Sequence, residues 1–368
     1  MMARLGDICE ILDSKRIPIT ASNRQAGIYP YYGANGIQDY VDDYIFDDEL
    51  VLLAEDGGHF GSTDKPIAYR VSGKCWVNNH AHVLKPNSGL DVDYLCYSLM
   101  FRDVSNIVNG ATRQKLTQAD MREIEIPLLP LGEQLAIVEK LNKIFALIFL
   151  RKQQLLKLDE LVKSRFIELF GNSNYPCEPL DNNVIEMFIG PFGSSLKNEF
   201  FVDEEDGFCM VYEQKHAIQK TMDVPTRYVP KSKYEELKRF TVLGGDIIVS
   251  CRGTIGEIYT VPDDAPMGIM HPSIMKIRLK TEKYNQRFFV FALKQYMDEH
   301  SAEAKGSGVK MAVSATVLGQ SDFVMPPLEV QNQFAAFVEQ VDKSKLAIQK
   351  SLEKLETLKK ALMQKYLG

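Results

Sequence analysis

The sequence contains one segment twice, and this repetition restricts the possible folds more than any other feature. A shift of 197 residues places Pro130 on Pro327 and Gln134 on Gln331 without a gap. The same shift places Gly171 on Gly368, so the two copies span residues 129–171 and 326–368. A segment that recurs at a fixed spacing marks a structural unit that occurs more than once. We therefore expect two equivalent units, each of which ends in the repeated segment.

Each copy is predicted to form one long helix. Neither contains Gly or Pro between residues 134 and 170 or between residues 331 and 367, and each ends in glycine, a residue that commonly follows a helix. At about 1.5 Å per residue, such a helix is roughly 55–60 Å long. Apolar residues recur along both copies at spacings of three and four. This helix seam consists of Val138, Leu141, Phe145, Ile148, Leu155, Leu158 and Val162 in the first copy and of Val338, Val341, Ile348, Leu352, Leu355 and Leu362 in the second.

Two amphipathic helices of equal length most simply pack on each other as a coiled coil. If each helix lay only on its own domain, most of the seam would stay uncovered. The chain before each helix also repeats, though more loosely. Buried strands are expected at residues 48–54 and 245–251, further strands at 67–71 and 258–261, and helices at 93–101 and 285–300. A basic loop with glycine then follows in each half, and a turn at Thr117 or Ser314 closes the unit.

Charge and cysteine content narrow the class of protein. The formal net charge is −6, so any contact with DNA must come from local basic loops, because phosphate neutralisation needs Lys and Arg. The six cysteines form no Cys-x-x-Cys pair, which argues against a zinc site and against a disulfide framework. No apolar run approaches the roughly 18 residues of a membrane span. The first residues do not resemble a secretory signal, so we expect a cytoplasmic protein that does not contact a membrane.

Motifs for catalysis are absent from the sequence. Residues 57–62 resemble a phosphate-binding loop but lack its lysine, and no Asn/Asp-Pro-Pro-Tyr/Phe motif of an amino-methyltransferase occurs. Residues 262–264 begin like a nuclease carboxylate motif, but no Asp/Glu-x-Lys follows at a usable spacing. No Gly-x-Ser-x-Gly motif occurs, and the six histidines stand apart in the sequence. We therefore predict no catalytic residue and no metal site in this chain.

The polar residues of the loops are better suited to reading DNA than to catalysis. Asn and Gln pair with adenine, Arg and Lys with guanine, and Ser and Thr with bases or phosphates. Each loop alone is more simply an ordinary surface loop, but similar loops recur at matching places in both halves. The candidate DNA-binding residues of the first half are Asn35, His59, Ser62, Thr63, Asn78, Asn79, His80, Thr112, Arg113, Gln114 and Lys115. Those of the second half are Ser194, Ser195, Lys197, Arg252, Thr254, His271, Ser273, Lys305, Ser307 and Lys310.

Over its whole length the chain resembles the specificity subunits of type I restriction-modification systems. The resemblance rests on residues 130–134 with the long helix that follows, on their copy at residues 327–331, and on Ile189-Gly190-Pro191-Phe192-Gly193-Ser194-Ser195-Leu196-Lys197. Residues 31–36, Tyr-Tyr-Gly-Ala-Asn-Gly, are also similar to the N-terminal recognition domain of that family. These motifs are moderately specific one by one and strongly specific together.

The resemblance implies an α+β fold with two target-recognition domains, separated by two long helices that pack as an antiparallel coiled coil. The domains are expected at residues 1–130 and 172–327, and the helices at 131–171 and 328–368. Each domain would read one half of a bipartite, asymmetric site in double-stranded DNA. Two methyltransferase subunits would dock on this chain, motor-nuclease subunits would join them, and methylation and cleavage would be catalysed by these partners. S-adenosylmethionine, ATP and magnesium would then be bound by the partners and not by this chain.

The sequence leaves two alternatives open. The chain could be a two-domain coiled-coil scaffold that binds protein partners and no DNA; the helices fit this equally well, whereas the basic glycine loops fit it less well. Alternatively it could be a self-sufficient methyltransferase or nuclease, which the missing motifs disfavour. Salt-dependent DNA binding would distinguish the first alternative, and addition of S-adenosylmethionine or magnesium to the pure protein would test the second.

Overall fold

A computed structural model describes residues 1–110, 113–171, 174–307 and 314–368, and for residues 301–307 it describes the backbone alone. The chain divides into two compact units. The first unit contains Met1–Leu155 together with Ala347–Gly368, and the second contains Leu156–Leu346. Each unit therefore includes one globular region and a part of each long helix, and each is described below by itself.

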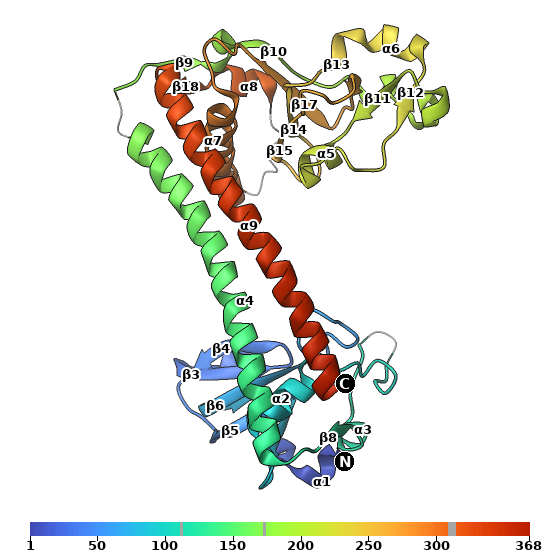
Figure 1. Ribbon diagram of the computed structural model, residues 1–368, viewed down its shortest axis with the longest axis vertical. Helices are drawn as coiled ribbons and strands as arrows, with labels where there is room; N and C mark the ends of the chain where they lie inside the picture. Colours follow the sequence, from blue (N-terminus) through green and yellow to red (C-terminus); the bar gives the residue numbers. More distant parts are fainter. Residues whose placement is uncertain (111–112, 172–173, 308–313) are drawn as a thin grey trace. The chain divides into compact units, whose positions relative to one another are not determined.

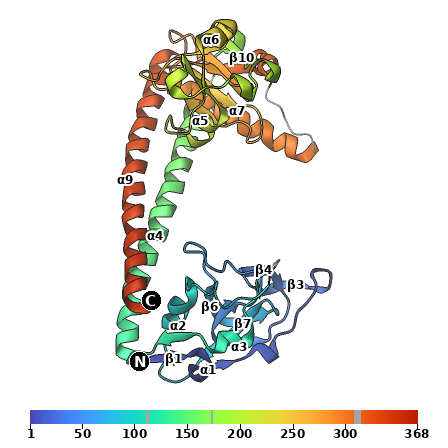
Figure 2. The same ribbon diagram turned by 90° about the vertical axis from the view of Figure 1, so that its right-hand side faces the viewer.

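The first unit is built on a mixed sheet with the strand order β2-β7-β5-β6-β3-β4. Strand β5 (Phe46–Ala54) is buried on both faces over most of its length, as its run of apolar residues predicts. Val51 and Leu53 lie on the face that helix α2 covers, whereas Leu50 and Leu52 lie on the opposite face. Figure 2 shows α2 (Val92–Met100) between this sheet and the long helix α4 (Leu131–Phe166). The other elements are β1 (Met2–Arg4), α1 (Leu5–Ile8), β2 (Cys9–Ile11), β3 (Ala26–Gly33), β4 (Gly36–Val41), β6 (Ala68–Val77), β7 (Ala81–Pro86), α3 (Gln118–Arg122) and β8 (Glu125–Pro127).

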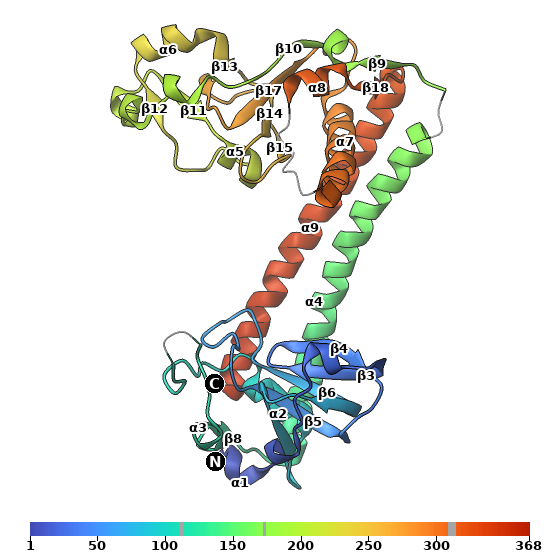
Figure 3. The same cartoon turned by 180° about the vertical axis from the view of Figure 1, so that it is seen from behind.

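The second unit contains two four-stranded sheets, with the strand orders β10-β17-β14-β15 and β12-β11-β16-β13, and a two-stranded sheet of β18 and β9. Helix α7 (Gln286–Ser307) packs on the first of them and on the beginning of helix α9 (Leu328–Leu367), as Figure 3 shows. The strands and remaining helices of this unit are β9 (Cys177–Pro179), β10 (Val184–Ile189), β11 (Cys209–Tyr212), α5 (Gln214–Gln219), β12 (Tyr228–Val229), α6 (Lys231–Leu237), β13 (Thr241–Val242), β14 (Ile247–Ser250), β15 (Ile258–Thr260), β16 (Gly268–Met270), β17 (Ile274–Leu279), α8 (Ala315–Gln320) and β18 (Asp322–Val324).

The strands and helices predicted before each long helix are present. Strands β5 and β14 confirm the buried strands expected at 48–54 and 245–251, and α2 and α7 confirm the two helices. The turns predicted at Thr117 and Ser314 are instead the N-caps of the short helices α3 and α8. The hydroxyl of Thr117 accepts from the backbone N–H of Asp120, and that of Ser314 accepts from Val317. Such a cap satisfies a backbone donor that the first turn of a helix leaves free.

In each unit the two long helices pack on one another (Figure 1). In the first unit, Ile144 and Ile148 of α4 form a buried cluster with Leu352 of α9. The ammonium of Lys152 lies 3.4 Å from the carboxylate of Glu356 beside this cluster. The first half of α4 therefore meets the second half of α9.

In the second unit the opposite ends of the helices meet. Val162 of α4 is buried in the same core as Phe334 and Val341 of α9. An ion pair joins Asp159 to Lys345. Since the end of α4 meets the beginning of α9 here, the helices run antiparallel, and the predicted fold class is confirmed. Among the described residues, no helix is both long and apolar enough to cross a membrane.

Not all residues of the predicted seam pack only on the other long helix. Val138 and Leu141 belong to the hydrophobic core of the first unit, which contains residues of both α2 and α9. Ile144, Phe166 and Phe334 also contribute to these contacts, although the predicted seam omitted them. Val138, Leu141, Ile148, Val162, Val341 and Leu352 are buried, whereas Phe145, Leu155, Leu158, Val338, Ile348, Leu355 and Leu362 are half-buried.

The repeated glutamine has the same hydrogen bonds in both units. Gln134 is fully buried; its carbonyl oxygen accepts from the N–H of Asp91 (2.8 Å), and its amide donates to the carbonyl oxygens of Gly89 and Leu129. Gln331 is also fully buried and has equivalent partners, with Asn285 in the place of Asp91. Asp91 and Asn285 directly precede α2 and α7. Each glutamine thus fixes the start of a long helix to the start of the helix beside it.

We predict that Gln134→Leu destabilises the first unit by about 2–4 kcal/mol, because it removes three hydrogen bonds of a fully buried amide and leaves their backbone partners in a partly buried place without it. The midpoint of chemical denaturation measures this loss. Gln154→Leu is the matched control, since Gln154 lies on the same helix but is exposed. Equal midpoints for the two variants would contradict the role assigned to Gln134.

Candidate nucleic-acid interface

In the first unit, loops that are distant in sequence meet at Gly57. The side-chain amide of Asn35, in the turn between β3 and β4, donates to the carbonyl oxygen of Gly57 at 3.0 Å. The N–H of Gly57 donates to the carbonyl oxygen of Gln114 at 3.2 Å. Gly57 has a φ of 63°, a left-handed conformation that favours glycine. The end of β5 is therefore tied both to the β3–β4 turn and to the basic loop before α3.

The carboxylate of Asp56 brings two basic candidates together at the same edge. Its Oδ1 lies 2.8 Å from Nδ1 of His80 and 2.8 Å from Nη2 of Arg113. The side chain of Arg113 is 60% exposed. Together with Asn35 and Gln114, whose backbone carbonyl oxygen accepts from Gly57, these residues form a group that we call the outer cluster. It presents amide, imidazole and guanidinium groups, which can pair with base edges and phosphates.

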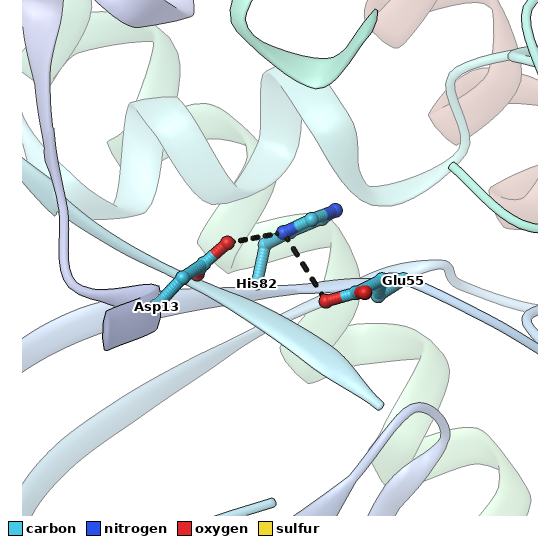
Figure 4. A group of neighbouring side chains, drawn as sticks. All are labelled: Asp13, Glu55 and His82. Atoms are coloured by element: carbon cyan, nitrogen blue, oxygen red, sulfur yellow. Dashed lines mark hydrogen bonds and ion pairs between the residues drawn. The ribbon is translucent and has the colours of Figure 1, made fainter. Parts of the chain in front are cut away.

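Glu55, which precedes Asp56 of the outer cluster, belongs to a buried group of ionisable side chains that Figure 4 shows. The Nδ1 atom of His82 is 2.6 Å from Oδ2 of Asp13 and 3.6 Å from Oε2 of Glu55. Its Nε2 atom is 3.0 Å from the carbonyl oxygen of Leu116. Both ring nitrogens therefore lie within hydrogen-bonding distance of oxygen atoms. We call Asp13, Glu55 and His82 the inner network.

Further donors surround the two carboxylates of the inner network. Arg16 donates to Oε2 of Glu55, and the ammonium of Lys115 lies 2.9 Å from Oε1 of the same residue. The side-chain amide of Gln118 donates to Oδ2 of Asp13 at 2.9 Å. Burial raises the pKa of Asp13, but hydrogen bonds from His82 and Gln118 outweigh it, so that the net pKa lies below its ordinary value. The pKa of Glu55 is also lowered overall, because Arg16 and Lys115 outweigh its burial.

The inner network also has the residue types of a metal site. Within the described part of the chain, Asp13, Glu55 and His82 are a group whose ligand atoms lie within 4.8 Å of one another. However, the guanidinium of Arg16 and the ammonium of Lys115 already neutralise these carboxylates. A metal cation would be repelled by these neighbours, so the group is an ion-pair network rather than a cation site.

The equivalent strand end of the second unit carries different residues. In the first unit the N–H of Glu55 donates to the carbonyl oxygen of His80, and in the second the N–H of Cys251 donates to that of Ser273. Arg252 and Thr254 follow β14 and are exposed. They lie in the loop that joins β14 to β15. At the positions equivalent to Asp56 and Gly57, the second unit thus has a loop with a basic and a hydroxyl side chain.

His271 lies beside this loop and is half-buried. Its Nδ1 atom is 2.7 Å from the hydroxyl of Ser273. Burial lowers the pKa of His271, and this outweighs the nearby negative charge of Glu213. A neutral ring at this position can accept or donate a hydrogen bond, as base reading requires.

The structure does not join every candidate to these groups. Asn78 is buried and its amide donates to Gln38, so its side chain is used inside the protein. The hydroxyl of Ser62 accepts from the N–H groups of Asp64 and Lys65, within its own turn. Thr63 lines a surface hollow beside the last turns of α9.

The other candidates differ in how far the structure describes them. The side chains of His59, Ser195 and Ser273 are half-buried or buried, and those of Asn79, Ser194 and Lys197 are exposed. Thr112 and Lys310 lie outside the described residues, and so do the side chains of Lys305 and Ser307. The sequence did not predict Asp56 or the inner network. The candidates were chosen as basic, amide and hydroxyl side chains that could contact DNA, and not as the acidic side chains that pair with them.

Comparison with known proteins gives consistent matches over both units. The family model described as "Type I restriction modification DNA specificity domain" matches residues 1–160 and 206–360. A relative from Haemophilus influenzae, named as a type I restriction enzyme specificity subunit, is 31% identical over 285 residues, which are 69% of this chain and 66% of that protein. A type I restriction enzyme specificity subunit of Methanocaldococcus jannaschii is 21% identical over 98% of this chain and 90% of its own length.

Solved structures share the fold. The crystal structure of a type I restriction-modification S subunit from M. genitalium matches with a TM-score of 0.55 and 16% identity, over 100% of this chain and 96% of that one. A chain from a structural study of complex assembly in a type I system matches with a TM-score of 0.61 and 16% identity, over 100% of this chain and 97% of that chain.

Proposed function

This chain belongs to the type I restriction-modification DNA specificity family, and from that premise we propose that each unit reads one half of a bipartite, asymmetric DNA site. One observation carries the proposal: exposed polar loops follow the equivalent central strands β5 and β14, but their residues differ. A shared frame with different loops suits two different half-sites. Membership of a family of DNA specificity domains favours this function over a scaffold that binds no DNA.

We further propose that the two long helices set the spacing between the half-sites and dock two methyltransferase subunits. Motor-nuclease subunits would join this core. Specificity subunits of this family are generally non-catalytic. Methylation and cleavage, with S-adenosylmethionine, ATP and magnesium, would therefore belong to the partners, and the complex would act on DNA in the cytoplasm. The acidic net charge of this chain means that the basic loops, together with basic partners, must supply the attraction for DNA.

Arg113→Ala tests the proposed function, because Arg113 is the exposed cation of the outer cluster. We expect binding of the assembled complex to its DNA site to weaken. A lost base contact should cost about 1–3 kcal/mol and relax specificity at one position. A lost phosphate contact should weaken binding to all sequences alike and reduce the salt slope by about one.

The matched control is Lys85→Ala, which removes one positive charge near the other end of β7. Its DNA affinity should stay unchanged. If Arg113→Ala also binds DNA like the wild type at every salt concentration, the outer cluster does not contact DNA. The equivalent test in the second unit is Arg252→Ala, since Lys310 lies outside the described residues.

A further inference from the structure

Among the described residues, the first unit has the inner network, and the equivalent positions of the second unit carry other residues. Strand β5 pairs Leu53 with His82, and the equivalent strand β14 pairs Val249 with Met275. The register of these strands and of β10 relates each polar residue of the network to an apolar or thiol residue of the second unit: Asp13 to Ile189, Glu55 to Cys251 and His82 to Met275.

The residues in the second unit belong to its hydrophobic core. Met275 and Cys251 are buried there, and Ile189 packs against them. The same strand arrangement is thus built without any charge at these three positions. Buried ion pairs often contribute little to stability compared with apolar residues of similar volume. The charges of the first unit therefore need an explanation other than the stability of the frame.

The contacts of the network suggest such an explanation. All three of its residues contact one short segment, residues 113–118, which leads from the outer cluster into α3. His82 contacts the carbonyl oxygen of Leu116, and the carboxylate of Glu55 pairs with Lys115. The N–H of Leu116 also donates to the carbonyl oxygen of Glu55 at 2.7 Å.

Asp13 holds the end of the same segment through the amide of Gln118. Arg113 and Gln114 stand at its beginning, where Arg113 pairs with Asp56 and Gln114 accepts from Gly57. The segment is thus fixed from below by the network and from the side by the outer cluster. A loop fixed at both ends loses less conformational freedom when it binds.

We propose that Asp13, Glu55 and His82 are positioning residues that hold residues 113–118 in one register, so that the first unit discriminates its half of the DNA site. The proposal rests on the proposed function of DNA reading. The cations Arg16 and Lys115 lie against the two carboxylates of the network, so the buried charges are paired.

The test uses the full-length chain assembled with methyltransferase subunits and a library of DNA duplexes with a randomised central segment. The wild type should enrich a bipartite motif, and the half that Arg113→Ala relaxes is assigned to the first unit. His82→Met gives the first unit the residue that the second unit has at the equivalent position. We expect discrimination at the first half to fall by about tenfold, while the second half stays unchanged.

Met275→Leu is the matched control and should leave both halves unchanged, because it replaces one apolar core residue with another. A merely structural role of His82 predicts a different result, since a smaller folded fraction lowers binding to all duplexes alike. Unchanged discrimination at the first half, or an equal loss at both halves, overturns the proposal. A wild type that enriches no motif overturns the proposed function, and the network proposal falls with it.

Gln118→Ala decides the matter if His82→Met does not fold. Gln118 is exposed, so its removal does not open the core, yet it deletes the donor to Asp13. We expect a smaller loss of discrimination, again confined to the first half. A folded Gln118→Ala variant with wild-type discrimination at both halves counts against the network as a positioning device.

Discussion

Leu352→Asp is expected to disrupt the contact between the two long helices in the first unit. Leu352 is 8% exposed and packs in one cluster with Ile144 and Ile148. The substitution removes the apolar contacts of a leucine and places a carboxylate among the apolar side chains of the cluster. Loss of the leucine alone costs about 2–5 kcal/mol, and the desolvated carboxylate adds to this cost. We therefore expect a large fall in melting temperature, measured by circular dichroism, and a loss of assembly with methyltransferase subunits.

Leu358→Asp is the matched control for this experiment. Leu358 lies on the same helix, within the same unit, but is 47% exposed. The same change of side chain there should alter stability little, because the new carboxylate stays in water. Equal melting temperatures for the two variants would mean that Leu352 does not hold α4 and α9 together.

The sequence was sufficient to predict the long helices because their signals are local. Helix α4 begins at Leu131, as expected, but its regular part ends at Phe166 and residues 167–171 form a π-helical turn. Phe166 and Phe170 both pack on Phe334 and Phe288. These aromatic contacts join residues far apart in the sequence, so no periodicity within the helix could indicate where its geometry changes.

The inner network shows where prediction from the sequence stopped. Asp13, Glu55 and His82 come from three separate segments, and only the register of β2, β5 and β7 brings them together. The histidines stand apart in sequence, but His82 lies 2.6 Å from Asp13 in the fold. By contrast, the equivalence of Thr117 and Ser314 had a local signal, since the two lie at the repeat spacing of 197 residues, although the sequence predicted turns there and the structure has helix N-caps. Features that depend on neighbouring residues or on the repeat could therefore be predicted from the sequence, whereas contacts that depend on the pairing of strands could not.

A fragment of residues 1–171 is expected to form a two-fold dimer. In the whole chain, the last turns of α9 pack on the first unit through Leu362, Met363, Tyr366 and Leu367. The fragment lacks these turns, which leaves the core of the first unit and the helix seam of α4 exposed. Exposed, self-complementary apolar surfaces commonly associate about a two-fold axis.

The repeat indicates which residues would cover the exposed surface. At the shift of 197 residues, residues 131–171 of a second copy supply Leu155 for Leu352, Phe166 for Met363 and Phe170 for Leu367. They also supply Val162 for Lys359, whose ammonium lies over the rings of Phe101 and Phe145. Each replacement is apolar, so one copy can take the place of the missing half of the other.

Such a dimer would present two identical recognition units in place of two different ones. With methyltransferase subunits it should favour an inverted repeat of the first half-site, at the spacing of the original site, because the helices keep their length. Sedimentation should give a dimer for the fragment and a monomer for its Leu155→Asp variant, and mapping of methylated sites should give the inverted repeat. A well-folded monomeric fragment, or a dimer that modifies only the original asymmetric site, would show that α4 cannot replace α9 in spite of their common sequence pattern.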